Sequence, residues 1–418
     1  MTQQLATLAT SSIAALAIAG VIVRPFGWPE WIFATLGAAL LIIAQLLPVS
    51  EGVAGIASGT DVYLFLAGMM LLAEIARREG LFDYLAARAA RASGGSPVRL
   101  FTLIFGVGTL VTVFLSNDAT AVVLTPAVIA VTRAAKAKDP IPYLLVCAFV
   151  ANAASFVLPI SNPANIVVFG SDMPPLGEWL ARFALPSLAA ILVTYAVLLL
   201  VTRRSLRKRI EPENETPELS RGGKVAAFGL GLAVAALLTA SALGADLGLP
   251  TALAGLATLL LVSLGERRSP WPTLGGVSWT TLVLVAGLFV IVRALDRIGL
   301  EAELVAALRW VSLEAGAWAA PIVGAATAIA ANLTNNLPLG LVAGGVVAAA
   351  DVSPKIVDAV LIGVDLGPNV SVTGSLATIL WLLALRREGI RYGALAFLKI
   401  GIVVTLPALA LALAASMV

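Results

Sequence analysis

The 418-residue chain contains no histidine and a single cysteine, Cys147. A lone cysteine cannot form a disulfide within the chain, and without histidine neither imidazole-based metal sites nor imidazole proton transfer are available. An enzyme mechanism is disfavoured for the same reason, because a nucleophile would lack its usual base and a metal its usual ligands. We therefore expect no enzyme, no metal site and no cofactor. Any group that exchanges protons here should be a carboxylate.

Charged residues are also scarce, at 12% of the chain, whereas 60% of the residues are hydrophobic. A water-soluble fold of this composition would aggregate. Apolar runs long enough for a hydrocarbon core of about 30 Å recur along the whole length, for example at 31–47 and 392–414. The sequence therefore predicts an all-α polytopic membrane protein surrounded by lipid. The net charge of +3 is assigned to loops between spans, and no nucleic-acid partner is expected.

The two halves of the chain resemble each other. The longest polar break, residues 203–224, lies near the middle and is predicted to be a linker. On its two sides, TDVYLFLAGMMLLAEIARREGLF from Thr60 resembles WTTLVLVAGLFVIVRALDRIGLE from Trp279. A further alignment places Asn152 opposite Asp365. Both halves thus indicate one repeated unit.

Each unit is predicted to contain three spans, a basic amphipathic stretch, a helical hairpin, an interrupted helix and a final span. These fall near 9–24, 30–49, 61–78, 81–95, 98–134, 141–171 and 176–202, and again near 225–243, 249–264, 278–296, 300–310, 315–350, 355–386 and 392–416. The hairpin arms hold fewer apolar residues than the roughly 20 of a crossing helix, so we predict that they are re-entrant. Five crossings per unit would place the second unit upside down, as in many secondary transporters.

This plan predicts scaffold and transport parts in both inverted repeats. The scaffold parts are 1–96 and 225–310, the transport parts, each with a hairpin and a broken helix, are 97–202 and 311–418, and the cytoplasmic linker is 203–224. Lys and Arg accumulate on the cytoplasmic side of membranes, and most of the 27 basic residues fall in loops that an outside amino terminus would place there. We therefore expect a multi-pass protein of the cell inner membrane with both termini periplasmic.

Four polar clusters interrupt the apolar sequence, where polar groups are costly unless they line a protein site. Two are predicted at the hairpin tips and two in the broken helices, where free backbone groups and helix amino ends add to the site. We predict that they converge on one midplane substrate site. Its candidate residues are Ser116, Asn117, Thr120, Ser161, Asn162, Asn165, Asn332, Thr334, Asn335, Asn336, Asn369, Thr373, Gly374, Ser375 and Thr378. Helix capping or helix packing is the alternative role for any one of them.

Asp118 and Asp365 are the two carboxylates predicted deep in the membrane, where an acid is by default functional. Burial without a nearby cation disfavours the charged form, so either residue could exchange and couple a proton. The alternative is a carboxylate that stays ionised and caps a broken helix. Glu74 is expected to form an ion pair or to extend to the membrane surface instead.

At these clusters the sequence resembles the ArsB-type arsenite and antimonite efflux permeases of the ion transporter superfamily, over essentially the whole chain. The resemblance rests on Asn117-Asp118 with LTP at 124–126, on NNLP at 335–338, and on the stretch 365–381. It implies a moving transport domain, proton-coupled export of arsenite and antimonite that confers arsenical resistance, and docking of an ArsA-type ATPase.

The polar residues suit such a substrate, because arsenous acid is uncharged at neutral pH and Asn, Ser and Thr can hydrogen-bond it without desolvating an ion pair. Sodium/proton antiporters and dicarboxylate/sodium symporters share this architecture, and fold analogy does not separate them. The four clusters contain no Arg or Lys to bind two carboxylates. Sodium exchange stays open as an alternative, because Asp118, Asn117 and free carbonyls could coordinate a hard cation.

Overall fold

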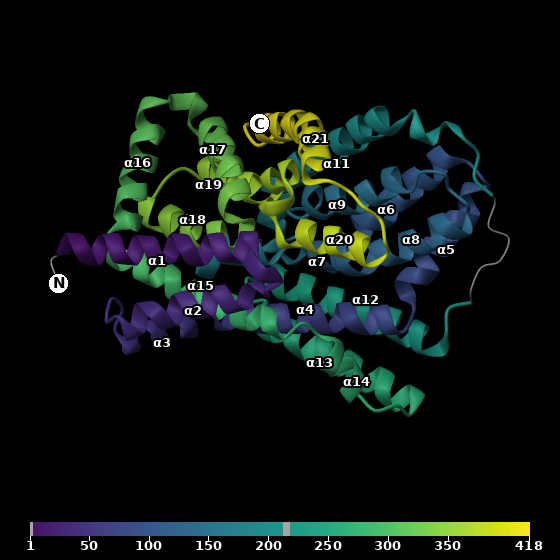
Figure 1. Cartoon of the computed structure of the whole chain (residues 1–418), viewed down its shortest axis with the longest axis horizontal. Coiled ribbons are helices and arrows are strands. Elements are labelled where there is room, and N and C mark those ends of the chain that lie inside the picture. Colours follow the sequence, from purple (N-terminus) through teal and green to yellow (C-terminus); the bar gives the residue numbers. More distant parts are fainter. Residues whose placement is uncertain (1–2, 212–217) are drawn as a thin grey trace.

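The computed structural model describes residues 3–211 and 218–418. Within these ranges every regular element is helical, which confirms the all-α prediction (Figure 1). Part of the predicted linker, residues 212–217, lies outside the described residues.

The two halves contain the same succession of helices. The first consists of α1 (Gln3–Val23), α2 (Glu30–Ile43), α3 (Val49–Ser58), α4 (Thr60–Arg78), α5 (Leu81–Ser93), α6 (Pro97–Phe114), α7 (Asn117–Ala119), a π-helical turn (Thr120–Leu124), α8 (Thr125–Ala134), α9 (Ile141–Ala153), α10 (Pro163–Phe169) and α11 (Leu176–Thr202). The second consists of α12 (Arg221–Ala242), α13 (Gly248–Glu266), α14 (Trp271–Gly276), α15 (Thr280–Arg297), α16 (Leu300–Glu314), α17 (Ala319–Thr334), α18 (Asn336–Ala350), α19 (Pro354–Leu366), two 3-10 turns (Gly367–Val370 and Val372–Gly374), α20 (Leu376–Arg387) and α21 (Ala394–Ala415). The short helices α3 and α14 were not predicted, and they occupy equivalent places before α4 and α15.

Local sequence explains where several of these helices end. Gly80 separates α4 from α5 with a φ of +73°, and its repeat partner Gly299 separates α15 from α16 with a φ of +91°. Glycine adopts this left-handed conformation without the steric cost that a Cβ imposes. The two amphipathic helices therefore leave the preceding spans at equivalent sharp turns.

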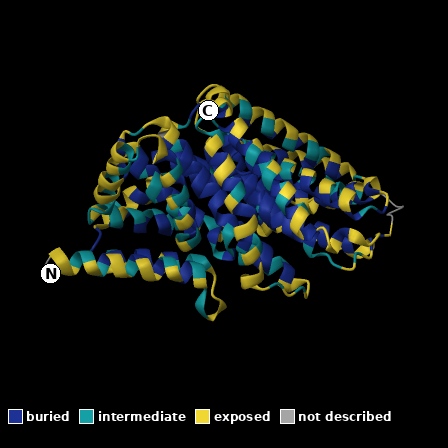
Figure 2. Ribbon diagram, turned by 90° about the horizontal axis from the view of Figure 1, so that it is seen from above, coloured by how far each residue is buried: buried dark blue, intermediate teal, exposed yellow. Residues whose placement is uncertain are grey.

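The two repeats run in opposite directions, as predicted. Figure 1 shows α5 at one end of the molecule and α16 at the other, and the hairpins enter from these opposite ends. Contacts are exchanged between the repeats: α4 packs on α13, α15 packs on α2, and α11 packs on α21. Figure 2 shows buried residues concentrated through the centre, where α9 and the second half of α19 are buried on all sides.

The first arm of each hairpin is longer than predicted. Among the described helices, seven are long and apolar enough to cross a membrane, and they include α6 and the segment Gly316–Thr334 that contains α17. The returning arms are short, with 10 residues in α8 and 15 in α18, as expected for re-entrant hairpins. Each first arm is followed by a reversal, and α8 returns to the end of the molecule at which α6 begins (Figure 1). The bent pair α3–α4, with an angle of 49°, would add an eighth span.

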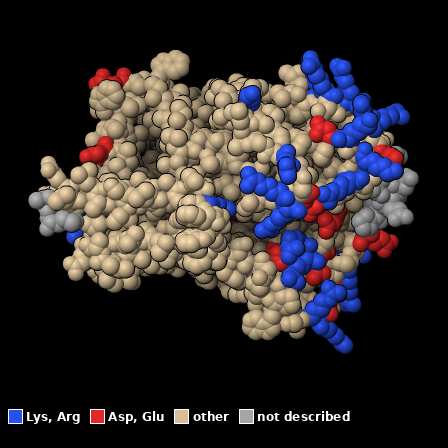
Figure 3. Space-filling view, in the orientation of Figure 1, with Lys and Arg blue, Asp and Glu red and all other residues tan. Residues whose placement is uncertain are grey.

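Basic residues are distributed unevenly along the long axis. Figure 3 shows Lys and Arg gathered at the end that holds α5 and the start of α12, whereas the opposite end shows few of them. Because Lys and Arg mark the cytoplasmic side of membrane proteins, this asymmetry agrees with the loop-charge pattern of the sequence.

Candidate functional site

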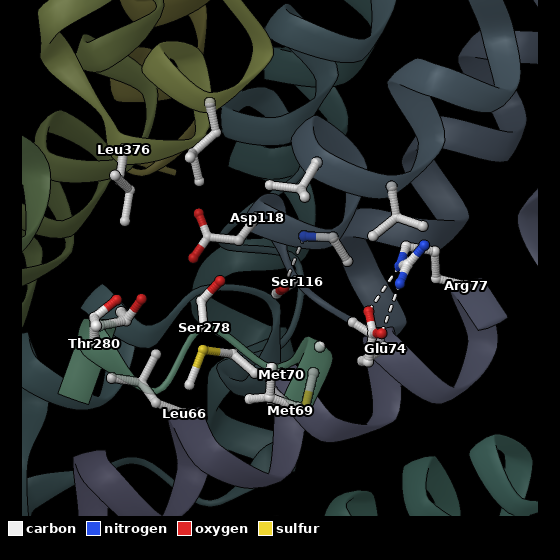
Figure 4. A pocket seen from close by; sticks show the side chains of 18 of the residues that line it. Leu66, Met69, Met70, Glu74, Arg77, Ser116, Asp118, Ser278, Thr280 and Leu376 are labelled. Carbon is white, nitrogen blue, oxygen red and sulfur yellow. Dashed lines mark hydrogen bonds and ion pairs between the residues drawn. The ribbon is translucent and has the colours of Figure 1, made fainter. Parts of the chain in front are cut away.

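A cavity of 540 Å³ lies between helices of both repeats. One wall consists of α4 and the segment that leads into α15, and the other consists of the first hairpin and the amino ends of α10 and α20. The lining includes Leu66, Met69, Met70, Glu74, Arg77, Ser116, Asp118, Val122, Pro163, Ser278, Thr280, Thr281, Leu376 and Arg387. Figure 4 shows the Asp118 side chain pointing into this space, with Ser278 and Met70 opposite.

The tip of the first hairpin holds Asp118 in place through its neighbours. Ser116 Oγ accepts a hydrogen bond from the Ala119 amide at 3.2 Å, and Asn117 Oδ1 accepts one from the Asp118 amide at 2.9 Å. These bonds cap the short helix α7 and fix the backbone that carries the acid. The Asp118 carboxylate itself makes no hydrogen bond or ion pair with any described residue, so both its oxygens are available to a proton or a ligand.

The wall opposite Asp118 supplies hydroxyl groups and thioethers. Ser278, Thr280 and Thr281 lie at the start of α15, and Met69 and Met70 lie on α4. Sequence reasoning missed these five residues, because they belong neither to a hairpin tip nor to a helix break. The short hydroxyl-rich run at 278–281 is the signal that could have found them. Together with Ser116 and Asp118 they can hydrogen-bond a small hydroxylated solute.

Ionic residues line part of the cavity. Arg77 Nε donates to Glu74 Oε2 at 2.7 Å, and Arg78 Nε donates to Glu74 Oε1 at 2.8 Å. This confirms the prediction that Glu74 forms ion pairs. Arg387 lines the same region. Glu74 and Arg77 lie near the carboxyl end of α4, which leads into α5 at the basic end of the molecule (Figure 3).

Asp365 lies elsewhere, fully buried near the end of α19 and outside the cavity lining. Its Oδ1 accepts a hydrogen bond from Asn162 Nδ2, and its Oδ2 lies within hydrogen-bond distance of Ser155 Oγ, both at 2.8 Å. Both partners belong to the broken helix of the other repeat. The two acids that the sequence treats alike therefore have different surroundings.

The broken helices also meet through amide groups. Asn152 of α9 donates to Asn369 Oδ1 at 3.0 Å, and Asn369 donates to the Phe149 carbonyl at 2.9 Å. Asn152 Nδ2 also lies 3.5 Å from Thr378 Oγ1. In each repeat, a side chain of the first half-helix thus bonds to residues in the helix break of the other repeat.

Most of the remaining candidate residues bind other protein groups. In the first repeat, the side chain of Thr120 bonds to Thr112, that of Ser161 to the Val113 carbonyl, and that of Asn165 to the Ser155 carbonyl. In the second repeat, the side chain of Asn332 bonds to the Gly367 carbonyl, that of Thr334 to the Ala330 carbonyl, and that of Ser375 to the Thr378 amide. The side chains of Asn335 and Thr373 bond to carbonyls of the facing segment. Asn336 is buried, and Gly374 packs against Pro368. Of the candidate residues, Ser116 and Asp118 line the cavity.

Metal binding finds no support at these positions. In the described part of the chain, no three His, Cys, Asp or Glu residues are grouped so as to hold a metal ion. Cys147 is buried inside α9, in agreement with a packing role.

The chain has two inverted helical repeats around an acid-lined cavity, and each repeat contains a hairpin and a broken helix. This is the architecture of a secondary membrane transporter. The family described as "Citrate transporter" (CitMHS) matches residues 14–385, so the chain belongs to this family. It is thus a transporter and not an enzyme.

Individual relatives agree. The chain is 31% identical over 431 residues to an arsenical pump membrane protein of Escherichia coli and 29% identical over 427 residues to that of Yersinia enterocolitica, covering 98% of both chains in each case. The resemblance to ArsB-type permeases is therefore confirmed. The YdaH transporter of Alcanivorax borkumensis shares the fold with a TM-score of 0.60 at 15% identity, covering 99% of this chain and 97% of YdaH. MtrF of Neisseria gonorrhoeae has a TM-score of 0.54 at 12% identity, with 99% and 94% covered.

Proposed function

We propose that the protein exports arsenite and antimonite across the cell inner membrane by proton antiport and thereby confers arsenical resistance. The observation that carries the proposal is the Asp118 carboxylate, unpaired among described residues, in a cavity lined by hydroxyl groups. The names of the relatives, arsenical pump membrane proteins, support the substrate.

Competition at Asp118 would couple the two fluxes. A hydroxyl of arsenous acid donates a hydrogen bond to the ionised carboxylate, while Ser116, Ser278 and Thr280 bond to its other oxygens. Protonation of Asp118 from the periplasm neutralises the carboxylate and turns one of its acceptor oxygens into a donor, which weakens the hydrogen bond to the solute and releases it. Loss of the proton to the cytoplasm then restores the site. Because proton and substrate exclude each other, each cycle exchanges one for the other.

Movement between the two parts of each repeat would alternate access. In this proposal the transport parts, 97–202 and 311–418, carry Asp118 and the amino end of α20. The scaffold parts, 1–96 and 225–310, carry Met70 and Ser278. The other cluster residues hold the hairpin tips and helix breaks rigid, so that Asp118 moves with them as one body.

The charge distribution sets the orientation of the proposal. We place the basic end (Figure 3) in the cytoplasm, which in this proposal leaves both termini periplasmic and the cavity open to the cytoplasm. An ArsA-type ATPase, if one acts with this protein, would dock at that end.

Substrate identity is tested in proteoliposomes with an imposed pH gradient. We expect arsenite and antimonite to dissipate the gradient, and sodium and citrate to leave it intact. Citrate is disfavoured because its carboxylates would lie beside the Asp118 carboxylate. Sodium is the second candidate, since Asp118 and the nearby hydroxyl oxygens are hard ligands. A response to sodium alone would make the protein a sodium/proton exchanger.

Orientation is tested by labelling a cysteine in the cavity. Native Cys147 is fully buried, whereas Ser278 is exposed in the cavity wall. We expect a membrane-impermeant maleimide to label Ser278→Cys in inside-out vesicles and to leave it largely unlabelled in right-side-out vesicles. The wild-type protein measures background labelling of Cys147, and Thr378→Cys is a matched control at a fully buried position. Labelling of Ser278→Cys from the periplasmic side alone would reverse the proposed topology.

A further inference from the structure

Asp365 is a buried acid that the proposed transport cycle does not use. It lies where the two broken helices cross, and neither of its oxygens reaches the cavity. We infer that Asp365 is held as a neutral, protonated acid whose proton forms a hydrogen bond between the two repeats. It is a positioning residue that holds the two broken helices together.

Two short contacts of Ser155 Oγ can both be hydrogen bonds only if Asp365 carries a proton. Ser155 Oγ lies 2.8 Å from the Asn152 carbonyl and 2.8 Å from Asp365 Oδ2. A hydroxyl has one hydrogen, and a backbone carbonyl can only accept. If Ser155 donates to that carbonyl, the second short contact is a hydrogen bond only when Asp365 Oδ2 carries the proton and donates to Ser155 Oγ.

The other carboxyl oxygen acts as an acceptor. Asn162 Oδ1 accepts the Ala164 amide at 3.1 Å, which fixes the orientation of the Asn162 side chain. Its NH2 group therefore faces Asp365 and donates to Oδ1 at 2.8 Å. One oxygen that accepts and one that donates is the pattern of a carboxylic acid. A carboxylate would leave Ser155 with two acceptors for a single hydrogen.

Nothing in the surrounding helices neutralises a charge at this position. Of the described elements packed against α19, only α11 and α21 carry ionic side chains, Glu178 and Arg182 on α11 and Lys399 on α21. Arg182 binds Glu178 and Asp358, and Asp358 lies seven residues, or about two helical turns, before Asp365. Lys399 is exposed on the outer face of α21. An ionised Asp365 would be a buried charge without a cation, which is costly.

The equivalent position in the first repeat supports this inference independently. Asn152, which aligns with Asp365, is also fully buried and also bonds to the break of the other repeat, through Asn369. There the side chain is a neutral amide. With a protonated Asp365, the inverted symmetry thus places a neutral side chain, with one hydrogen-bond donor group and one acceptor oxygen, at the equivalent position of both broken helices. A protonated Asp365 matches Asn152 in charge and in hydrogen-bonding pattern.

A permanently neutral Asp365 leaves proton coupling to Asp118 alone, and this part of the inference rests on the proposed function. The hydrogen bonds between the two broken helices would allow the two transport parts to move together without carrying a charge through the membrane. Asparagine at 365 can reproduce the arrangement, because its NH2 donates to Ser155 and its oxygen accepts from Asn162. Leucine has a similar size but fills neither role.

Infrared spectroscopy of the purified protein with carboxyl-13C aspartate tests the protonation directly. At neutral and mildly alkaline pH we expect the carbonyl band of a protonated carboxylic acid, which persists in Asp118→Asn and is lost in Asp365→Asn. Asp365→Asn should melt within a few degrees of wild type and retain arsenite-driven proton movement within about threefold, a difference below 1 kcal/mol. Asp365→Leu should melt several degrees lower.

Two results would overturn the inference. One is a wild-type spectrum in which no protonated-acid band depends on Asp365. The other is a well-folded Asp365→Asn protein that retains arsenite binding but has lost proton movement, since this would make Asp365 the coupling acid. If wild-type protein moves no protons with arsenite, the proposed function fails, yet the spectrum and the melting temperatures still decide the protonation of Asp365.

Discussion

Asp118→Asn is expected to abolish arsenite-driven proton movement and to weaken arsenite binding about tenfold to a hundredfold. The first effect follows because asparagine cannot take up and release a proton at this position. The second follows because a hydrogen bond to a charged acceptor is replaced by a neutral one, and such bonds contribute about 1.5–3 kcal/mol. Proton flux in proteoliposomes and arsenite binding to the purified protein measure the two effects separately.

Asp351→Asn is the matched control for this change. Asp351 is exposed, lies at the end of α18 away from the cavity, and has a φ of +50° that asparagine tolerates. It should transport at the wild-type rate. If Asp118→Asn instead moves protons with arsenite as fast as wild type, Asp118 is not the coupling residue and the proposed competition between proton and substrate is wrong.

Gly68→Leu is expected to cause a large loss of folded protein. A Cβ at Gly68 would lie 2.3 Å from the Thr251 carbonyl oxygen, which is backbone and cannot rotate away. Helices α4 and α13 would have to separate, and overpacking of this kind costs about 1–3 kcal/mol or more. The yield of monodisperse protein and its melting temperature after extraction measure the effect.

Gly231→Leu is the matched control, because Gly231 lies in the neighbouring helix α12 and a Cβ there meets nothing within 4 Å. It should be extracted in wild-type yield. The repeat partner of Gly68, Gly287, approaches α2 in the same way, with an added Cβ 2.9 Å from the Ala34 carbonyl carbon. Normal yield and melting of Gly68→Leu would show that the contact between α4 and α13 is not close in the folded protein.

Sequence repetition accounts for much of the fold. Gly68 and Gly287 align, and both prove to be sites of close helix contact between the repeats. Gly80 and Gly299 also align, and both adopt the left-handed conformation that ends a span. Polar residues in apolar surroundings located both hairpin tips and both helix breaks. These features follow from local chemistry, since backbone conformation and the cost of burying polar groups depend on nearby residues.

The cavity could not be located in the same way. Ser278, Thr280 and Met70 face Asp118 because α4 and the start of α15 lie across the cavity from the first hairpin, and no local pattern reports which distant helix lies opposite (Figure 4). The short helices α3 and α14 were missed for a related reason. They precede longer spans and add no clear apolar period of their own.

By itself, the sequence determined a helical membrane transporter with inverted repeats, two hairpins, two broken helices and two acids among polar residues. Only the tertiary structure decided that these acids differ. Asp118 faces an open cavity with no partner among described residues, while Asp365 is enclosed by Ser155 and Asn162 of the other repeat. The physical reason is that the state of a buried carboxyl depends on neighbours brought together by folding, which lie some 200 residues away in this chain: 210 residues for Ser155 and 203 for Asn162.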